Sequence, residues 1–169
     1  MTLTINAGST SLKYALFDAR LVELARGEFC NETINEVLFQ KITADLATFF
    51  TSTQTLLCVA HRVVHGGRKY QKPIKISQRI LSELKTLAAL APLHNPFNIK
   101  GIELAHKIFP NAKQYAVFDT GFFAELPEQA RVYPIPLSKY EKDHIQKYGF
   151  HGISHQYALA EARKKNKNS

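Results

Sequence analysis

The first thirty residues alternate apolar and polar side chains, and this period of two constrains the fold more than any other feature. Three alternating runs, residues 2–6, 12–17 and 22–29, are separated by turn residues at 7–10 and 18–20. Successive side chains of a strand point to opposite faces of a sheet. The pattern therefore predicts an antiparallel meander of three strands with one buried face.

Beyond residue 30 the spacing of apolar side chains lengthens to three or four residues, and expected helices then alternate with expected strands. Residues 33–50 carry apolar side chains, Val37 and Phe49 among them, three or four positions apart, which predicts a helix with one buried face. The elements expected after it are a buried strand over 56–64, a helix over 80–88 capped by Ser77, a helix over 99–108, a strand over 114–118 and a helix from about Ser154. This order predicts an α/β fold, with a mixed sheet covered by helices.

Length and composition place the chain among globular proteins of one domain. Its 169 residues are 45% hydrophobic and 21% charged, which is typical of a folded domain and not of a disordered or collagen-like chain. No apolar run approaches the roughly 18 residues of a membrane span, and the first residues lack the features of a secretory signal. Cys30 and Cys58 form no metal or redox motif. We therefore expect a cytoplasmic protein without disulfides or a membrane partner.

The excess of positive charge is concentrated at the end of the chain. The net charge is +8, from 22 basic and 14 acidic residues, and four of the basic side chains lie in the last seven residues. Basic stretches can bind nucleic acid or anionic surfaces, but no recognised nucleic-acid-binding module accompanies this one. We therefore interpret the tail as a solvated end and expect no nucleic-acid partner.

The first candidate site is the turn between the first two expected strands. Residues 6–11, Asn-Ala-Gly-Ser-Thr-Ser, combine a glycine with three hydroxyls and exposed backbone N–H groups, which together can surround a phosphate. Lys13 adds a positive charge on the next strand. The segment lacks the spacing of a Walker loop and opens no helix, and an ordinary polar hairpin has the same residue types.

The second candidate site lies at the end of the expected buried strand. Arg62 precedes the glycine pair at 66–67, where a guanidinium could clamp a carboxylate or a phosphate. The alternative is that Arg62 is half of an ion pair, and that His61 and His65 are structural histidines with satisfied hydrogen bonds.

Three further segments combine polar side chains with a constrained backbone. Residues 92–96 form an expected loop, stiffened by two prolines, that presents a leucine, a histidine and an asparagine. Asp119 ends the last expected strand, where α/β sheets place their ligands, and could bind Mg²⁺ or accept a proton, or instead cap a helix or turn. Residues 148–155 hold an aromatic side chain and a histidine between two glycines, and their histidine spacing matches no zinc motif.

In their order along the chain, these five segments resemble the N-terminal half of the acetate kinases. The similarity runs from Thr2 to about Glu161. It implies an actin-like, sugar-kinase-like domain of the ribonuclease H-like class, a fold in which two such domains enclose a nucleotide. It also implies reversible, Mg²⁺-assisted transfer of the γ-phosphoryl group of ATP to acetate or propionate, which gives an acyl phosphate and ADP.

The resemblance assigns the nucleotide side of the site to the first segment. Asn6 would position Mg²⁺. The residues that would face the phosphates of ATP are Ser9, Ser11 and Lys13.

The resemblance assigns the acceptor side of the site to the other segments. Arg62 would hold the carboxylate of the substrate. The residues that would form the apolar pocket for its alkyl group are Val64, Leu93 and Phe150. The residues that would act on the transferring phosphoryl group are Asp119, as catalytic acid, and His151 with His94, as stabilisers of charge in the transition state.

Two features depart from the family pattern. Residues 121–123, Gly-Phe-Phe, stand where the family usually has Ala-Phe-His. The second, nucleotide-side domain is expected to be absent, which leaves an N-terminal domain at 1–161 and a basic tail at 162–169. We therefore expect the isolated chain to show at most trace kinase activity. The alternative is a non-catalytic domain that binds phosphate or nucleotide, or that associates with itself, for example as a homodimer.

Overall fold

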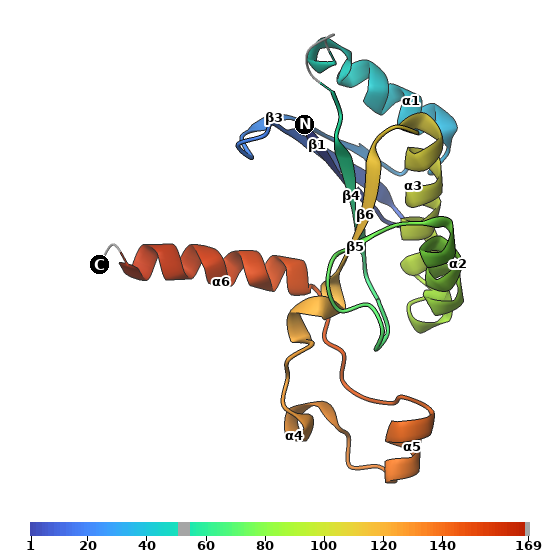
Figure 1. Cartoon of the computed structure of the whole chain (residues 1–169), viewed down its shortest axis with the longest axis vertical. Coiled ribbons are helices and arrows are strands. Elements are labelled where there is room, and N and C mark those ends of the chain that lie inside the picture. The colour runs from blue at the N-terminus through green and yellow to red at the C-terminus, as the bar shows by residue number, and fades with distance from the viewer. Residues whose placement is uncertain (51–54, 168–169) are drawn as a thin grey trace.

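The structure is a computed structural model that describes residues 1–50 and 55–167. Among these residues, six strands form one mixed sheet in the order β3-β2-β1-β4-β6-β5 (Figure 1). The expected meander is confirmed by three antiparallel strands, namely β1 (Thr2–Ala7), β2 (Ser11–Phe17) and β3 (Glu23–Cys30). The other strands are β4 (Cys58–Val63), parallel to β1, β6 (Lys113–Phe118), parallel to β4, and β5 (Ile74–Lys75), antiparallel to β6.

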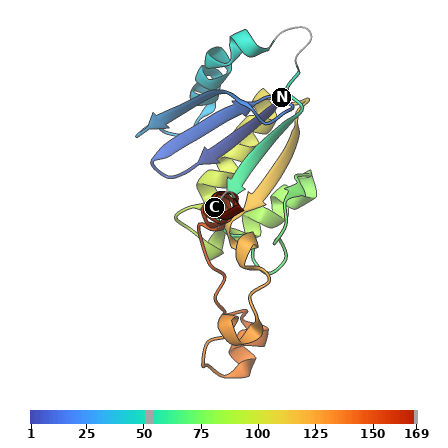
Figure 2. The same ribbon diagram turned by 90° about the vertical axis from the view of Figure 1, so that its left-hand side faces the viewer.

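Helices cover one face of this sheet. α1 (Glu36–Asp45), α2 (Gln78–Thr86) and α3 (Asn95–Ile108) lie on the same side of it, whereas α6 (Gly152–Lys167) projects from the opposite side (Figure 1, Figure 2). A 3₁₀ turn, η3 (Asp119–Phe123), follows β6 directly. The chain then makes an excursion away from the sheet that carries two short helices, α4 (Glu128–Arg131) and α5 (Leu137–Lys142). No helix within residues 1–50 and 55–167 has the length and apolarity to cross a membrane.

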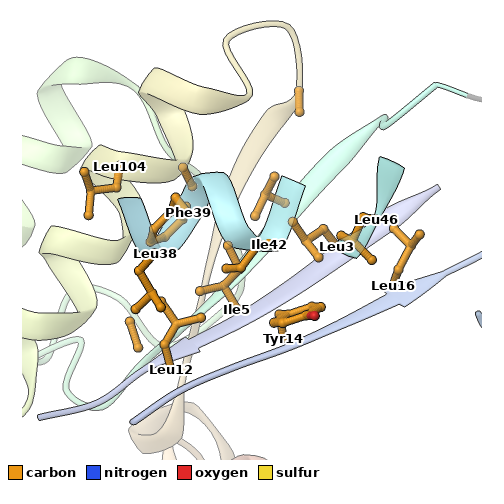
Figure 3. Packing of buried hydrophobic residues seen from close by; sticks show 14 of the residues in the cluster. Leu3, Ile5, Leu12, Tyr14, Leu16, Leu38, Phe39, Ile42, Leu46 and Leu104 are labelled. Carbon is orange, nitrogen blue, oxygen red and sulfur yellow. The ribbon is translucent and has the colours of Figure 1, made fainter. Parts of the chain in front are cut away.

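The larger part of the core lies between the meander and α1 (Figure 3). Its most deeply buried side chains, at most 2% exposed, include Leu3, Ile5, Leu12, Leu16, Leu38, Phe39, Ile42 and Leu46. Because side chains alternate along a strand, every second residue of β1 and β2 faces the helices. The intervening residues, which include Asn6 and its cross-strand neighbour Lys13, face the other side of the sheet.

Helix α1 is shorter than the apolar spacing predicts. It begins after Asn35, whose side chain accepts a hydrogen bond from the N–H of Leu38, and it ends at Asp45. Residues 47–49 form a separate 3₁₀ turn. The prediction that Val37 lies on the buried face is wrong, since its side chain is 60% exposed and the neighbouring Leu38 occupies that face.

Residues 92–96 are not simply the expected loop, because α3 begins within them. Asn95 is the first helical residue and is buried. Of the leucine, histidine and asparagine that the loop was expected to present, only Leu93 and His94 are therefore exposed. Pro96 lies in the first turn, where its missing N–H would have no helical partner.

The last helix begins two residues before its expected start. α6 begins at Gly152 and continues to Lys167, so residues 162–167 extend the helix without a break. The expected boundary between a domain at 1–161 and a tail at 162–169 therefore coincides with no change of secondary structure in the described residues.

His61 of β4 is a structural histidine, as one of the two interpretations of its segment held. It is fully buried, and its ring Nε2 donates to Oε1 of Gln114 at 2.7 Å. Burial lowers the pKa of His61 to about 4, from an ordinary value of 6.5. Below pH 6.5 His61 becomes protonated in the unfolded chain, whereas in the folded chain it stays neutral down to about pH 4. The free energy of unfolding should therefore fall as the pH is lowered through this window, in total by about 3 kcal/mol.

Replacing His61 with leucine should remove this pH dependence. Between pH 7 and pH 5, the wild-type free energy of unfolding should fall by about 2 kcal/mol more than that of His61→Leu. Urea unfolding at the two pH values measures this difference. His106→Leu is the matched control, because His106 is exposed and its replacement should leave the wild-type pH dependence in place. Equal pH dependence in all three proteins would contradict the assignment.

Candidate functional site

Arg62 is the centre of the candidate site, one residue before the end of β4. Its Nε and Nη2 donate to the carboxylate of Asp119, with Nη2 to Oδ2 at 2.6 Å, and its Nη1 donates to Oδ1 of Asn6 at 3.2 Å. The Asp119 side chain is 1% exposed and that of Arg62 is 30% exposed. β4 and β6 are parallel neighbours that end at the same edge of the sheet, and this pairing brings the two charges together.

Asn6 and Lys13 extend the site over the open face of the sheet. A hollow of about 900 Å³, here called the sheet hollow, is lined by Asn6, Lys13, Arg62 and His151 among others. Arg62 contacts both Asn6 and Asp119, so side chains from β1, β4 and the start of η3 meet at one point. Lys13 pairs with Glu28 at 3.1 Å, and this contact lowers the pKa of the Glu28 carboxyl. An exposed pair of this kind contributes little, so the Lys13 ammonium can exchange its partner for another anion.

A smaller pocket of about 350 Å³, here called the Arg62 pocket, adjoins the sheet hollow. It brings together seven residues that the sequence predicts for the site: Arg62, Val64, Leu93, His94, Asp119, Phe150 and His151. Val64 is buried in its wall, whereas Leu93 and Phe150 are 73% and 47% exposed at its rim. The pocket therefore combines a guanidinium with apolar side chains, which suits a small molecule with an anionic head and a short alkyl group.

None of the three hydroxyl residues of the first turn, Ser9, Thr10 and Ser11, lines the sheet hollow or the Arg62 pocket. The N–H of Gly8 donates to the carbonyl of Ser11 at 2.8 Å and closes the turn. Ser9 lines a separate hollow of about 520 Å³, together with Thr10 and Lys100. The structure thus groups Asn6 and Lys13 with Arg62, and Ser9 with a different depression.

Two buried asparagines of α3 hold the wall of the Arg62 pocket; sequence reasoning gave Asn98 no role and expected Asn95 to be presented by a loop. Oδ1 of Asn98 accepts from the N–H of Val64 at 3.0 Å, and its Nδ2 donates to the carbonyl of Ala7 at 2.6 Å. Asn95 makes the same kind of paired contact with the N–H and carbonyl of His65, at 3.1 and 3.0 Å. The available signal was a pair of amides three residues apart, in register with the apolar face of the helix, because amides at such positions must find partners in the interior.

The buried ring of His65 connects the segment that follows β4 with the bend that carries Phe150. Its Nδ1 accepts from the N–H of Gly67 at 2.9 Å, and its ring lies 4.5 Å from that of Tyr148 and 5.9 Å from that of Phe150. Burial lowers the pKa of His65, which favours the neutral ring that this acceptor contact requires. His65 is therefore a structural histidine that supports a pocket residue.

The segment that carries Phe150 and His151 is a tight bend. Gly149 and His151 both adopt left-handed backbone conformations, with φ of 75° and 56°. Such a conformation is unusual for a residue other than glycine, although Leu21, Asn31 and His144 also adopt it here. Phe150 and His151 both line the Arg62 pocket as a result.

The oxygen atoms around Arg62 suit a divalent cation in part. Among the described residues, no three His, Cys, Asp or Glu side chains are arranged to hold a metal ion. Mg²⁺, however, is commonly bound by one or two carboxylates, with water and substrate phosphates as its other ligands. The Asp119 carboxylate and the Asn6 amide oxygen meet at one guanidinium and fit this kind of shared site.

Comparisons with known proteins point to one family. The sequence model described as the acetokinase family matches residues 23–168. An acetate kinase from Sulfurovum sp. (strain NBC37-1) is 46% identical over 114 residues, which cover 68% of this chain and 29% of that protein. An acetate kinase from Clostridium botulinum (strain Alaska E43 / Type E3) is 36% identical over an alignment of 194 residues, which covers 96% of this chain and 49% of that protein.

Solved structures give the same result. A propionate kinase from Francisella tularensis superimposes with a TM-score of 0.85 at 32% identity, and an acetate kinase from Porphyromonas gingivalis with a TM-score of 0.84 at 30% identity. Each match covers 98% of this chain and 49% of the other. The actin-like fold that the sequence predicts is thereby confirmed. The chain spans about half the length, or less, of the relatives it matches.

Proposed function

The chain belongs to the acetokinase family, and we propose that it forms the carboxylate-binding half of an acetate kinase. The observation that carries this proposal is the Arg62–Asp119 pair beside an apolar pocket. A guanidinium has five N–H donors. Asp119 and Asn6 each engage one of the two Nη atoms, so each Nη retains a hydrogen for a substrate carboxylate. Bidentate recognition of that carboxylate would fix its position.

The proposed reaction is phosphoryl transfer from ATP to acetate. An oxygen of the acetate carboxylate attacks the γ-phosphorus, the bond from that phosphorus to the β–γ bridging oxygen breaks, and ADP leaves with those electrons. Arg62 would orient the attacking carboxylate, and Asp119 would hold the guanidinium from its other edge. His151, with His94, would stabilise the charge on the transferring group, because such catalysis depends mainly on positioning and electrostatics.

The open face of the sheet would take the nucleotide phosphates. Lys13 would exchange its exposed contact with Glu28 for phosphate oxygens, and Ser11, on the same face of β2 as Lys13, would offer a further donor. Asn6 and Asp119 would hold Mg²⁺, which, when bound, neutralises charge on the β- and γ-phosphates. We further propose a cytoplasmic site of action, in keeping with the free thiols of Cys30 and Cys58.

Formation of acetyl phosphate tests this proposal. The chain is assayed with ATP, Mg²⁺ and acetate, alone and mixed with the C-terminal half of the acetate kinase from Porphyromonas gingivalis. We expect turnover in the mixture and at most traces from the chain alone, because the exposed Leu93 and Phe150 leave the rim of the pocket uncovered and closure commonly completes such sites. A mixture without turnover, from a chain that also binds no acetate, would instead favour a non-catalytic domain.

Val64 should set the preference for acid length. Val64→Ala in the active mixture should raise kcat/KM for propionate relative to acetate by about 10-fold, because one methylene in such a pocket is worth about 1–3 kcal/mol. The measurement is the ratio of kcat/KM for the two acids. Val59→Ala is the control, since Val59 is buried in the main core on β4, the strand that leads to Val64, and its loss should leave the ratio unchanged. An unchanged ratio in Val64→Ala would place the alkyl pocket elsewhere.

A further inference from the structure

The bend that carries Phe150 and His151 lies directly against the 3₁₀ turn η3. A Cβ atom added to Gly149 would lie 2.2 Å from Cδ2 of Phe123, and one added to Gly152 would lie 1.9 Å from the carbonyl oxygen of Asp119. Real Cβ atoms essentially never approach other atoms within 3.0 Å. The two glycines on either side of the pocket residues therefore allow the bend to lie on η3 without a gap.

Phe123 contacts this bend at both of its ends. Its ring covers the bare Cα of Gly149 and lies edge-on to His155, with ring centroids 5.8 Å apart. The N–H of His155 donates to the carbonyl of His151 at 3.0 Å in the first turn of α6. Along the chain, the pocket residues Phe150 and His151 thus lie between Gly149 and His155, and the ring of Phe123 contacts both of these residues.

The geometry points to Phe123 as a positioning residue of the Arg62 pocket. Its ring sets where Phe150 and His151 lie relative to Arg62 and Asp119, and so sets the width of the pocket. The assignment of this pocket to a carboxylate rests on the proposed function, but the support that Phe123 gives to the bend does not. Because protein interiors are closely packed, a void behind the bend lets it relax away from the guanidinium.

Hydrogen exchange on the whole chain, followed by mass spectrometry, tests whether Phe123 supports the bend. Phe123→Ala should speed exchange of the amides in residues 149–156 by at least about tenfold, because local stability reports the packing of that segment. Phe123→His, which keeps a flat ring, should restore much of the protection. Phe29→Ala is the matched control, since Phe29 is also a half-buried aromatic ring, stacked on Tyr14, but lies on β3 at the far edge of the sheet. It should leave exchange in residues 149–156 unchanged.

Carboxylate affinity provides the second measurement. In Phe123→Ala the ratio of propionate to acetate affinity should rise severalfold, while Phe29→Ala should keep the wild-type ratio. If Phe123→Ala fails to fold, Phe123→Leu takes its place and should give a smaller increase in exchange at the same residues. Equal exchange at 149–156 in the Phe123 and Phe29 variants would overturn the positioning role. A wild-type chain that binds neither acid would overturn the proposed function, while the exchange result would still decide the role of Phe123.

Discussion

Arg62→Ala should lower kcat/KM for acetate and for propionate alike, by at least about a hundredfold. Removing one partner of a buried, hydrogen-bonded charge pair commonly costs 2–5 kcal/mol, and here the same side chain would also bind the substrate. Both acids present the same carboxylate, so their ratio should stay as it is in the wild type. The measurement is kcat/KM for the two acids in the mixture with the C-terminal half of a relative.

The same variant should also lower the free energy of unfolding. The Asp119 carboxylate, which is 1% exposed in the wild type, loses its main charged partner in this variant, and an uncompensated buried charge costs about 3 kcal/mol. Adding Asp119→Asn should recover part of this stability without recovering activity. Arg79→Ala is the control, because Arg79 forms an exposed pair with Glu83 on α2, away from both pockets of the site, and should change neither quantity measurably. A stable Arg62→Ala protein with wild-type turnover would contradict the role of the pair.

Gly66→Ala should strongly lower the free energy of unfolding. A Cβ at Gly66 would lie 2.0 Å from the carbonyl oxygen of Tyr70 and 2.8 Å from Cδ1 of Phe118. Tyr70 and Phe118 are buried and stacked on each other, so neither can move aside freely. Overpacking of this kind costs about 1–3 kcal/mol, and a backbone clash lies at the upper end. Urea unfolding measures the loss.

Gly8→Ala is the matched control for this prediction. Its added Cβ would meet the Ser11 carbonyl oxygen at 3.4 Å, which is ordinary contact. Alanine restricts the unfolded chain more than glycine does, so the free energy of unfolding should stay within about 0.5 kcal/mol of the wild type. A Gly66→Ala protein as stable as Gly8→Ala would show that the segment after β4 is loosely packed.

The strands were predictable from local pattern, and the helix limits were not. Alternation over residues 2–17 depends on one buried face of a sheet, and the sequence displays that constraint directly. The start of α3 depends instead on Asn95, whose amide pairs with the backbone of His65, thirty residues earlier in the chain. The proline at 96 suggests a loop when it is considered alone, and only tertiary contact shows that it belongs to the first turn of a helix.

Most of the residues that line the Arg62 pocket were candidates from the sequence, but the contacts between them could not be predicted. Arg62 and Asp119 were each candidates for the substrate site, and their ion pair follows from the pairing of β4 with β6, which no local pattern reveals. The support given by Asn98 and Phe123 was missed for a related reason, since both act on backbone that is distant in sequence. Ser9 differs from these residues, because it belongs to the first candidate segment but lines a hollow separate from the Arg62 pocket.

The central claim is that the Arg62 pocket takes a short carboxylate, and an NMR titration of the ¹⁵N-labelled chain tests it most directly. Acetate is compared with acetamide, which has a similar shape and no charge. We predict saturable shifts at Arg62, Val64 and His151 with acetate, much weaker ones with acetamide, and none with acetate in Arg62→Ala. Equal responses to acetate and acetamide, or acetate shifts that persist in Arg62→Ala, would contradict the claim.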